Sequence, residues 1–372
     1  MNIKVIGHYI GKFGELWQQG LTDLVKEGVE GVLADAAIDP ASIDAIFVAN
    51  KAGGSFNEQR HLGALVSEHF THLPPAMRVE GACASGGLAI IAAQQALLSG
   101  LYKTVLVLGV EKMTDVSGGQ ASAILATAAS REKEYGSTFP ALYAVLANYH
   151  MHRYGTSREQ LSSVVVKNHQ HALSNPKAQF HKEFTLEQVS NSTLVASPLR
   201  LLDCSPISDG VAAVILSSQT SARQTQILGF GQGQDTLALQ DRQDLGQLMA
   251  TKKAATQAFK MASLSQKDIQ AIEVHDCFSI AEILATEDLG FFAKGEAAKA
   301  VATGKTTYGG QLVVNPSGGL KACGHPVGAT GVKQVAFLAS LIEAGQFERA
   351  LAHNVGGSGA TAVVNILGKS KS

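Results

Sequence analysis

An internal repeat is the feature of this sequence that most constrains its fold. Residues 37–50 (AIDPASIDAIFVAN) align with residues 263–276 (SLSQKDIQAIEVHD) at an offset of 226 residues. Residues 86–109 align more loosely with residues 331–354, at an offset of 245. Both blocks keep the same order, which favours a true duplication over the ordinary likeness of α/β units. The sequence therefore predicts two similar α/β halves packed about a pseudo-two-fold axis.

Strands and helices alternate within the first half. Residues 3–8, 43–50 and 104–110 are apolar runs typical of buried strands. Apolar positions recur at helical spacing from Leu21, and residues 85–99 predict an apolar helix. This alternation predicts a mostly parallel sheet with helices on both faces.

Residues 119–204 fit neither half. They hold 8 Lys+Arg against 6 Asp+Glu and are rich in His, Tyr, Asn and Ser. We expect an inserted loop domain here, between an N-terminal half (1–118 with 205–222) and a C-terminal half (223–372). Its histidines leave a metal site open, but no cysteine or carboxylate completes a ligand set, so we expect surface histidines.

The composition excludes several classes of protein. A net charge of −1 argues against a general nucleic-acid binder. Only 16% of residues are charged, which suggests extensive burial in a core or against a partner. Four cysteines in 372 residues do not make a disulfide framework. We find no signal peptide and no membrane-spanning run, and expect a cytoplasmic protein.

Cys83 is the first candidate for chemistry. It lies in VEGACASGGLAIIAAQQALL (79–98), between an expected strand end and a helix start rich in small residues. The helix dipole and free backbone N–H groups are expected to lower the thiol pKa there. This is the geometry of a nucleophile elbow with sulfur in place of oxygen. A buried structural cysteine remains equally open from this segment alone.

His325 is the second candidate. Pro326 follows it and is favourable at the start of a helix, which we expect to run from Val327 to about residue 344. The helix dipole there keeps the imidazole neutral and able to accept a proton. Nearby glycines, including Gly328 and Gly331, are expected to allow close approach of a ligand.

A third element is the segment EVHDCFSIAE (273–282). It predicts a strand ending at His275 and a helix opened by a capping box of Ser279 and Glu282. His275 and Cys277 are then expected at the carboxyl edge of the sheet, where open α/β sheets place active sites.

Two further observations leave alternatives open. The Gly-rich bend in residues 352–364 offers backbone N–H groups to an oxyanion, or is a plain hairpin. A zinc site is a second possibility, with four side chains as its ligands: His275, Cys277, Cys323 and His325.

Taken together, these motifs resemble those of the thiolase superfamily. Cys83 in GACASGG, His325 in GGLKACGHPVGATG and the duplicated halves carry the resemblance. HDCF (275–278) and HNVG (353–356) resemble the sterol-carrier-protein-type thiolases and their bacterial and archaeal relatives. The resemblance implies a duplicated thiolase-like α/β fold, with two βαβαβαββ halves forming a layered α/β/α/β/α core and an inserted loop domain.

The resemblance also implies a role for each candidate residue. Cys83 is expected to be the nucleophile that accepts the acyl group, and His325 to activate it. Cys277 is expected to move protons to and from the substrate α-carbon. His275 is expected to hold a water at one oxyanion hole, which His325 also lines. The other hole is expected to use backbone N–H groups of Cys83 and of the bend at Gly356.

The expected function is that of an acyl-CoA:acetyl-CoA C-acyltransferase in fatty acid or lipid metabolism. It would cleave 3-ketoacyl-CoA by thiolysis, or run the reverse Claisen condensation, through an acyl-Cys83 intermediate. One alternative is a decarboxylating β-ketoacyl synthase using Cys83, His275 and His325, which needs no second thiol. Another is a thiolase-like subunit that is active only in a complex.

The expected partners follow from this function. Coenzyme A and its acyl thioesters are the substrates, without a separate cofactor or metal. Lys177 and Lys182 are weak candidates for contact with the phosphates of coenzyme A, and a solvated surface explains each of them better. The family implies a homodimer or a dimer of dimers.

Overall fold

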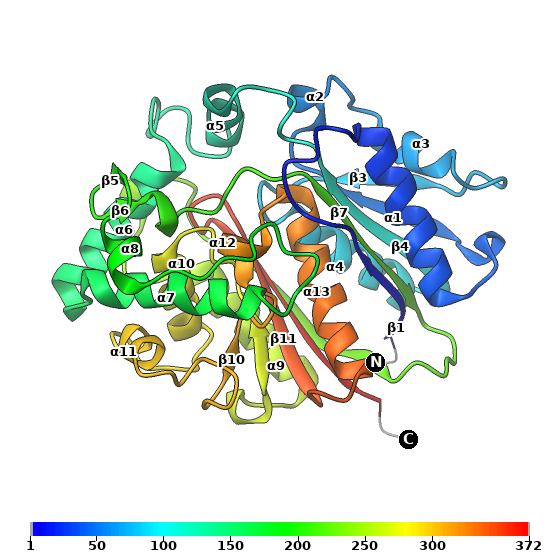
Figure 1. Cartoon of the computed structure of the whole chain (residues 1–372). Coiled ribbons are helices and arrows are strands. Elements are labelled where there is room, and N and C mark those ends of the chain that lie inside the picture. The colour runs from blue at the N-terminus through cyan, green and yellow to red at the C-terminus, as the bar shows by residue number, and fades with distance from the viewer. Residues whose placement is uncertain (1–2, 371–372) are drawn as a thin grey trace.

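A computed structural model describes residues 3–370 (Figure 1). Ten strands of this part of the chain form one sheet. The N-terminal half contributes β1 (Ile3–Ile10), β2 (Ala45–Ala49), β3 (Ala76–Val79), β4 (Thr104–Glu111) and β7 (Gly210–Ser217). The C-terminal half contributes β8 (Thr225–Gln234), β9 (Ala271–Glu273), β10 (Val313–Val314), β11 (Arg349–Gly356) and β12 (Thr361–Lys369).

The order of the strands shows the predicted duplication. The sheet runs β10-β9-β11-β12-β8-β1-β7-β4-β2-β3, so each half has the same order outward from the central β8–β1 pair. That pair joins the halves at Ile3 opposite Ile227 and Lys4 opposite Gln226. Strands β4 and β11 begin and end at positions related by the 245-residue offset of the repeat. The duplicated α/β fold is therefore confirmed.

The prediction of a mostly parallel sheet is wrong. Only β2 with β3 and β4, and β9 with β10 and β11, pair in parallel. The other pairs are antiparallel. Only the short bend of residues 357–360 separates β11 from β12, and so short a connection can only return the chain antiparallel.

Helices form three layers around the two half-sheets. Those of the duplicated halves are α1 (Leu21–Ala36), α2 (Gly53–Phe56), α3 (Leu62–Ser67), α4 (Ser85–Leu98), α9 (Met249–Ala262), α10 (Ser279–Asp288), α11 (Ala297–Ala302), α12 (Gly319–Cys323) and α13 (Val327–Glu343). Residues of both half-sheets pack on α4 and α13, which form the middle layer. Helix α1 covers the outer face of the N-terminal half and α9 that of the C-terminal half. These five layers are the predicted α/β/α/β/α core.

Strand β4 shows how the sequence builds these layers. Val105 and Val107 pack on the middle helices, whereas Leu106 and Leu108 pack on α1. Successive side chains of a strand point to opposite faces, so a strand with helices on both faces needs an apolar run along its middle, as in residues 105–110 of β4. All eight residues of β4 are buried.

The region between β4 and β7 adds no strand to the large sheet. Its elements are α5 (Gly118–Ala126), α6 (Phe139–Tyr154), α7 (Arg158–Ala172), α8 (Leu186–Ser190), β5 (Leu194–Ala196) and β6 (Leu199–Arg200). It packs on α10 and α11 through a hydrophobic cluster that includes Tyr143 and Phe278. The division into two halves and an inserted loop domain at the stated boundaries stays a prediction.

The expectation of surface histidines in this region is wrong for three of them. His150, His169 and His171 are buried. His150 hydrogen-bonds Thr156 and lies 3.2 Å from a carboxylate oxygen of Glu287. The polar composition thus reflects buried hydrogen bonds as well as solvated surface. Across residues 3–370, none of the helices combines the length and apolar character needed to cross a bilayer.

Candidate active site

Cys83 lies on a strained turn between β3 and α4. Ala82 has a φ of 53°, in the left-handed region that side-chain-bearing residues avoid. The Glu80 carboxylate accepts the N–H of Ala82 at 2.7 Å. The Ser85 hydroxyl donates to the Ala82 carbonyl at 2.6 Å and accepts the N–H of Gly81 at 3.0 Å. These bonds hold the turn that presents the Cys83 thiol at the N-terminus of α4.

His325 lies just before α13, as predicted from Pro326. Its backbone N–H donates to the Ser208 hydroxyl at 2.9 Å, and its Nδ1 lies 2.7 Å from Oγ1 of Thr330. The Thr330 hydroxyl donates to the Pro326 carbonyl at 3.0 Å, so it accepts from the ring. Nδ1 therefore carries the hydrogen, and Nε2 is free to accept a proton.

Two glycines bring the start of α4 close to the start of α13. A Cβ on Gly86 would lie 2.7 Å from the backbone nitrogen of Gly331, and one on Gly331 would lie 2.3 Å from that of Gly87. No larger residue fits this crossing. The space at Gly331, predicted to admit a ligand, is instead filled by the start of α4, and this contact brings Cys83 and His325 together.

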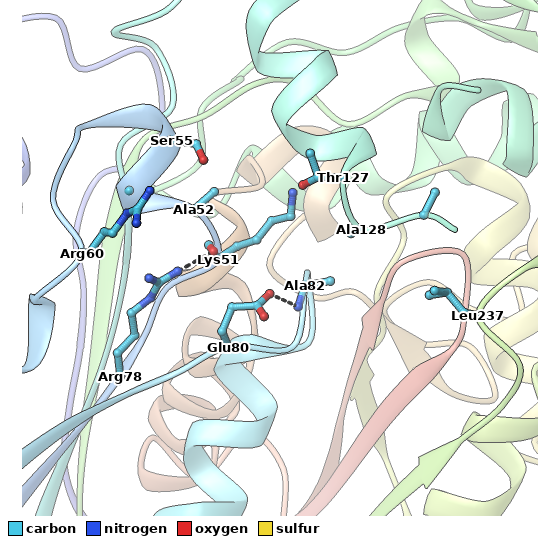
Figure 2. A pocket seen from close by; sticks show the side chains of 12 residues that line it. Lys51, Ala52, Ser55, Arg60, Arg78, Glu80, Ala82, Thr127, Ala128 and Leu237 are labelled. Carbon is cyan, nitrogen blue, oxygen red and sulfur yellow. Dashed lines mark hydrogen bonds between the residues drawn. The ribbon is translucent and has the colours of Figure 1, made fainter. Parts of the chain in front are cut away.

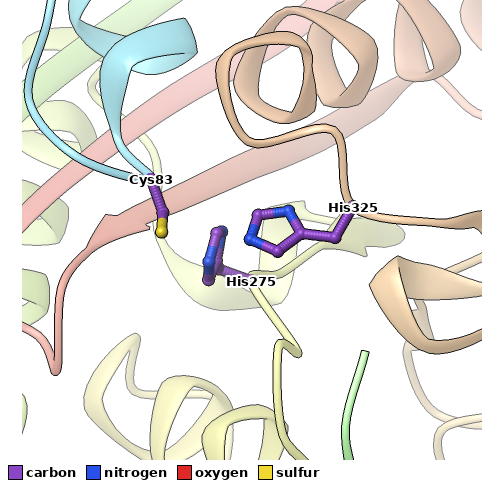
Figure 3. Close-up of side chains that lie close together, drawn as sticks. All are labelled: Cys83, His275 and His325. Atoms are coloured by element: carbon purple, nitrogen blue, oxygen red, sulfur yellow. The ribbon is translucent and has the colours of Figure 1, made fainter. Parts of the chain in front are cut away.

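Cys83, His275 and His325 meet at one point. The Cys83 sulfur and one ring nitrogen of each histidine all lie within 4.8 Å of one another. Figure 3 shows the thiol directed toward both rings, whose centroids are 4.9 Å apart and whose planes are almost perpendicular, at 84°. Residues 83 and 275 come from the strand-to-helix connections β3–α4 and β9–α10, and residue 325 from the link between α12 and α13.

Asn354 orients His275. Its Oδ1 accepts the N–H of Gly87 at 2.9 Å, which fixes the amide so that Nδ2 donates. Nδ2 lies 3.1 Å from Nδ1 of His275 and 3.0 Å from the carbonyl of Cys83. His275 Nδ1 is thus the acceptor, and Nε2 carries the proton. That Nε2 is buried and has no partner within residues 3–370, which suits a donor kept for a substrate oxygen.

Cys277 lines the same cavity as Cys83 and His325. The cavity has a volume of about 240 Å³, and its other lining residues include Tyr143, Phe278 and Gly357. Gly356 ends β11, and it is the following residue, Gly357, whose backbone N–H lies at the Cys83 sulfur. The structure therefore brings the two thiols and His325 to one cavity, which Gly357 also lines, and the oxyanion role expected for Gly356 stays a prediction.

The loop that carries Cys277 is held by contacts that the capping-box prediction missed. The Ser279 hydroxyl donates to Asp203 at 2.6 Å instead of capping α10. The Glu282 carboxylate accepts from Asn168 at 2.9 Å and from Asn315 at 2.7 Å. The capping box is wrong because distant partners take both side chains.

Burial controls the protonation of the site. It raises the pKa of the Cys83 thiol, although Lys51 and the N–H groups of Gly357 and Cys83 act in the opposite direction. The expected lowering of this pKa by the start of α4 is not seen in the free site. Burial also lowers the pKa of His325 to about 3, with contributions from Lys333 and Lys51. Thiol and imidazole therefore start neutral, and the sulfur becomes nucleophilic as its proton moves to Nε2.

The pKa of the other two groups shifts for the same reason. Burial raises the pKa of Cys277 above its ordinary range, although the Tyr143 hydroxyl acts against it. Burial lowers the pKa of His275 well below its ordinary value, and His325 and His353 add to the shift. Both groups are thus neutral before reaction.

Lys51 is the cation whose charge most favours a Cys83 thiolate. Its ammonium group donates to the carbonyls of Ile124 and Leu125 at 2.8 and 3.0 Å. It lines a separate, polar cavity of about 690 Å³, with Arg78 and Glu80 (Figure 2). Lys177 and Lys182 lie over the rings of Tyr9 and Phe184 and line neither cavity.

The four side chains of the zinc hypothesis do not converge. Cys323 is buried in the central core, 3.5 Å from Nδ2 of Asn175. Among the described residues, the potential metal-binding atoms that lie close together belong to Cys83, His275 and His325. Cys277 and Cys323 are not members of this group.

Sequence reasoning missed four contributors to this geometry. Thr330 stands one helical turn after Pro326, so the helix start was a usable signal for it. Asn354 belongs to the HNVG motif but received no role. Gly357 follows the residue chosen in the Gly-rich bend, and Tyr143 lies in the insertion, where no pattern pointed to it.

The family follows from comparison with known sequences. Residues 4–220 match the thiolase N-terminal domain, and residues 231–369 match a thiolase C-terminal domain-like family. This chain belongs to the thiolase family. The resemblance drawn from its motifs is therefore confirmed, and the two matched regions follow the two halves of the duplicated fold.

Individual thiolase relatives match along nearly the whole chain. An acetyl-CoA acetyltransferase of Methanothermobacter thermautotrophicus is 48% identical over 99% of this chain and 100% of its own length. Sterol carrier protein 2 of Gallus gallus is 34% identical over 96% of this chain and 70% of its own.

Solved structures share the thiolase fold. The Ltp2-ChsH2(DUF35) aldolase has a TM-score of 0.84 at 23% identity, over 100% of this chain and 98% of its own. Human mitochondrial 3-ketoacyl-CoA thiolase in complex with CoA has a TM-score of 0.78 at 18% identity, over 100% of this chain and 98% of its own.

Proposed function

We propose that this protein is an acyl-CoA:acetyl-CoA C-acyltransferase that works through an acyl-Cys83 intermediate. The convergence of the Cys83 sulfur with ring nitrogens of His275 and His325, within 4.8 Å, carries the proposal. The acetyl-CoA acetyltransferase at 48% identity supports acetyl-CoA as one substrate. The reaction is thiolytic cleavage of a 3-ketoacyl-CoA or its reversal.

In the cleavage direction, Cys83 is acylated first. The thiol proton moves to Nε2 of His325, and the sulfur bonds to the 3-keto carbon of the substrate. The bond between carbons 2 and 3 breaks, and its electron pair leaves on carbon 2 as the enolate of acetyl-CoA. Cys277 gives its proton to that carbon, so acetyl-CoA departs and Cys277 is left as thiolate.

The second half-reaction restores both cysteines. The thiol of incoming coenzyme A gives its proton to the Cys277 thiolate, and its sulfur bonds to the acyl carbon. The bond to Cys83 breaks, and the Cys83 sulfur takes back the proton held on His325. The sum is 3-ketoacyl-CoA plus coenzyme A giving acyl-CoA plus acetyl-CoA.

Donors around the sulfur suit the charge that develops. The backbone N–H groups of Cys83 and Gly357 lie at the sulfur, where they would stabilise a tetrahedral oxyanion on the acyl group. Nε2 of His275 would serve the enolate oxygen, directly or through a water. Losing one such donor typically slows acyl transfer by about 100- to 1000-fold.

Alkylation tests whether Cys83 is the nucleophile. Iodoacetamide should abolish thiolysis of acetoacetyl-CoA in step with modification of Cys83, read by peptide mapping. Cys83→Ala should be inactive, whereas Cys323→Ala, a buried thiol outside the cavity, should keep its activity. Inactivation that leaves Cys83 unmodified would contradict the proposal.

A decarboxylating β-ketoacyl synthase is the second candidate, because the same Cys-His-His convergence suits it. Decarboxylation itself generates the carbanion, so Cys277 has no task there. Malonyl-dependent condensation that survives Cys277→Ser would favour this candidate over the thiolase reaction.

The third candidate is a thiolase-like subunit that is active only in a complex. The similar fold of the Ltp2-ChsH2(DUF35) aldolase, whose name joins two components, supports this candidate. Purified protein that shows no thioester exchange until a second protein is added would support this candidate.

We further propose coenzyme A thioesters as substrates, a homodimer or dimer of dimers, and a cytoplasmic location in fatty acid or lipid metabolism.

A further inference from the structure

Tyr143 lines the cavity that holds both thiols. It is the largest fully buried side chain of the described residues and comes from α6, outside the duplicated halves. Its hydroxyl donates to the carbonyl of Gly357 at 3.1 Å. Its ring stacks on Phe278, the neighbour of Cys277, with centroids 4.6 Å apart and an angle of 27°. Tyr143 and Cys277 line the same cavity.

The hydroxyl has one hydrogen to give, which the carbonyl of Gly357 accepts, and the Cys277 sulfur lines the same cavity. The carbonyl of Gly357 takes that hydrogen while Cys277 is a neutral thiol, which is a poor acceptor. A thiolate is a stronger acceptor than a peptide carbonyl. When Cys277 loses its proton, the thiolate therefore competes with the carbonyl of Gly357 for this hydrogen.

We propose that Tyr143 is a positioning residue whose hydroxyl moves from Gly357 to Cys277 when that sulfur is ionised, and so stabilises the thiolate that forms in each turnover. The inference rests on the proposed function, in which Cys277 exchanges protons with the α-carbon. In the condensing direction, the thiolate takes a proton from the methyl of acetyl-CoA and becomes a thiol. The electron pair of the broken C–H bond becomes the enolate.

The surroundings of Cys277 leave Tyr143 as the neutral donor for its sulfur. The groups that act on the pKa of this thiol include Tyr143, Cys83, Lys321 and Asp276, and His325 lines the same cavity. The Lys321 ammonium group is engaged by the carbonyl of Asp203, and the Asp276 carboxylate accepts the N–H of Leu320 at 2.7 Å.

Deuterium exchange at the methyl of acetyl-CoA in D₂O isolates the proton transfer. Tyr143→Phe keeps the ring on Phe278 and removes only the hydroxyl. We expect exchange to slow by about 10- to 100-fold, the factor for one hydrogen bond to a charged group. We also expect its pH profile to shift alkaline. Alkylation of Cys83 by iodoacetamide, a step that does not use Cys277, should change less than twofold.

Tyr149→Phe is the matched control. It lies on the same helix, its hydroxyl donates to Asp244 at 3.0 Å, and it does not line the cavity. It should leave exchange unchanged. Replacing Tyr143 by 3-fluorotyrosine keeps the ring and strengthens the donor, so its pH profile should shift acidic, the direction opposite to Tyr143→Phe.

The outcomes separate this inference from the proposed function. If Cys277→Ala abolishes exchange but Tyr143→Phe exchanges like the parent protein, only the role of Tyr143 is overturned. If Tyr143→Phe slows alkylation of Cys83 and exchange equally, the tyrosine acts through the fold, and the inference also fails. If Cys277→Ala exchanges like the parent, or the parent does not exchange at all, the proposed function fails with it.

Discussion

Thr330→Val tests how the structure prepares His325 to take a proton. Valine keeps the shape of the buried threonine but removes the oxygen that accepts from Nδ1 at 2.7 Å. Without it, Nδ1 can lose its hydrogen to Nε2, and the imidazolium formed by proton transfer loses a charged hydrogen bond. Such a bond contributes about 1.5–3 kcal/mol, so reaction at Cys83 should slow by about 10- to 100-fold.

The assay is the second-order rate of iodoacetamide alkylation at Cys83, followed by peptide mapping, which needs no assumption about substrate. Thr286→Val is the control, because Thr286 is also buried and also donates to a carbonyl four residues earlier, but contacts no histidine. Thr330→Ser should retain most of the rate. Alkylation of Thr330→Val at the parent rate would refute the assignment of the proton to Nδ1.

Three further predictions follow from the packing and the protonation of the site. Gly331→Ala places a methyl 2.3 Å from the nitrogen of Gly87. It should lower the free energy of unfolding by about 1–3 kcal/mol in urea titrations. An unchanged urea midpoint would show that α4 and α13 can move apart at no cost. Burial lowers the pKa of His325 and of His353 to about 3. The unfolded chain therefore binds more protons below about pH 6.5, and the free energy of unfolding should fall toward pH 3 by up to about 1.4 kcal/mol per pH unit for each ring; a urea midpoint that stays flat from pH 7 to pH 4 would contradict this. Cys277→Ala should still acetylate at Cys83 but lose deuterium exchange at the acetyl methyl, and retention of exchange would remove Cys277 from the mechanism.

Much of the fold could be predicted from the sequence, because the duplication presents the same hydrophobic pattern twice. Residues 37–50 and 263–276 contain the same apolar run in the same order, and β2 and β9 occupy equivalent positions in the two half-sheets. Periodicity reports which face of an element is buried but not which strand lies beside it. The sequence therefore did not predict that β7 pairs antiparallel with β1 and β4, or that β12 pairs antiparallel with β8 and β11.

The candidate site was readable where a local pattern carries the chemistry. The small residues around Cys83 and the proline after His325 both mark helix starts, and the structure places both residues there. The pKa of Cys83 was predicted in the wrong direction, because burial depends on what the rest of the chain places over the thiol.

Other contributors depend on long-range contacts that no local pattern encodes. The local pattern predicts that Ser279 caps α10, but its hydroxyl donates to Asp203, 76 residues earlier. Tyr143 reaches Gly357 across 214 residues, from an insertion without a repeat to anchor it. Such residues are visible only once the halves and the insertion are assembled.

The central claim is that Cys83 carries the acyl group, and direct detection of that thioester tests it best. The protein is mixed with acetyl-CoA, quenched in acid, digested and mapped by mass spectrometry. We predict one acetyl group on Cys83 that hydroxylamine removes, and none in Cys83→Ala. An acetyl group on another cysteine, or turnover without any acetylated cysteine, would contradict the account.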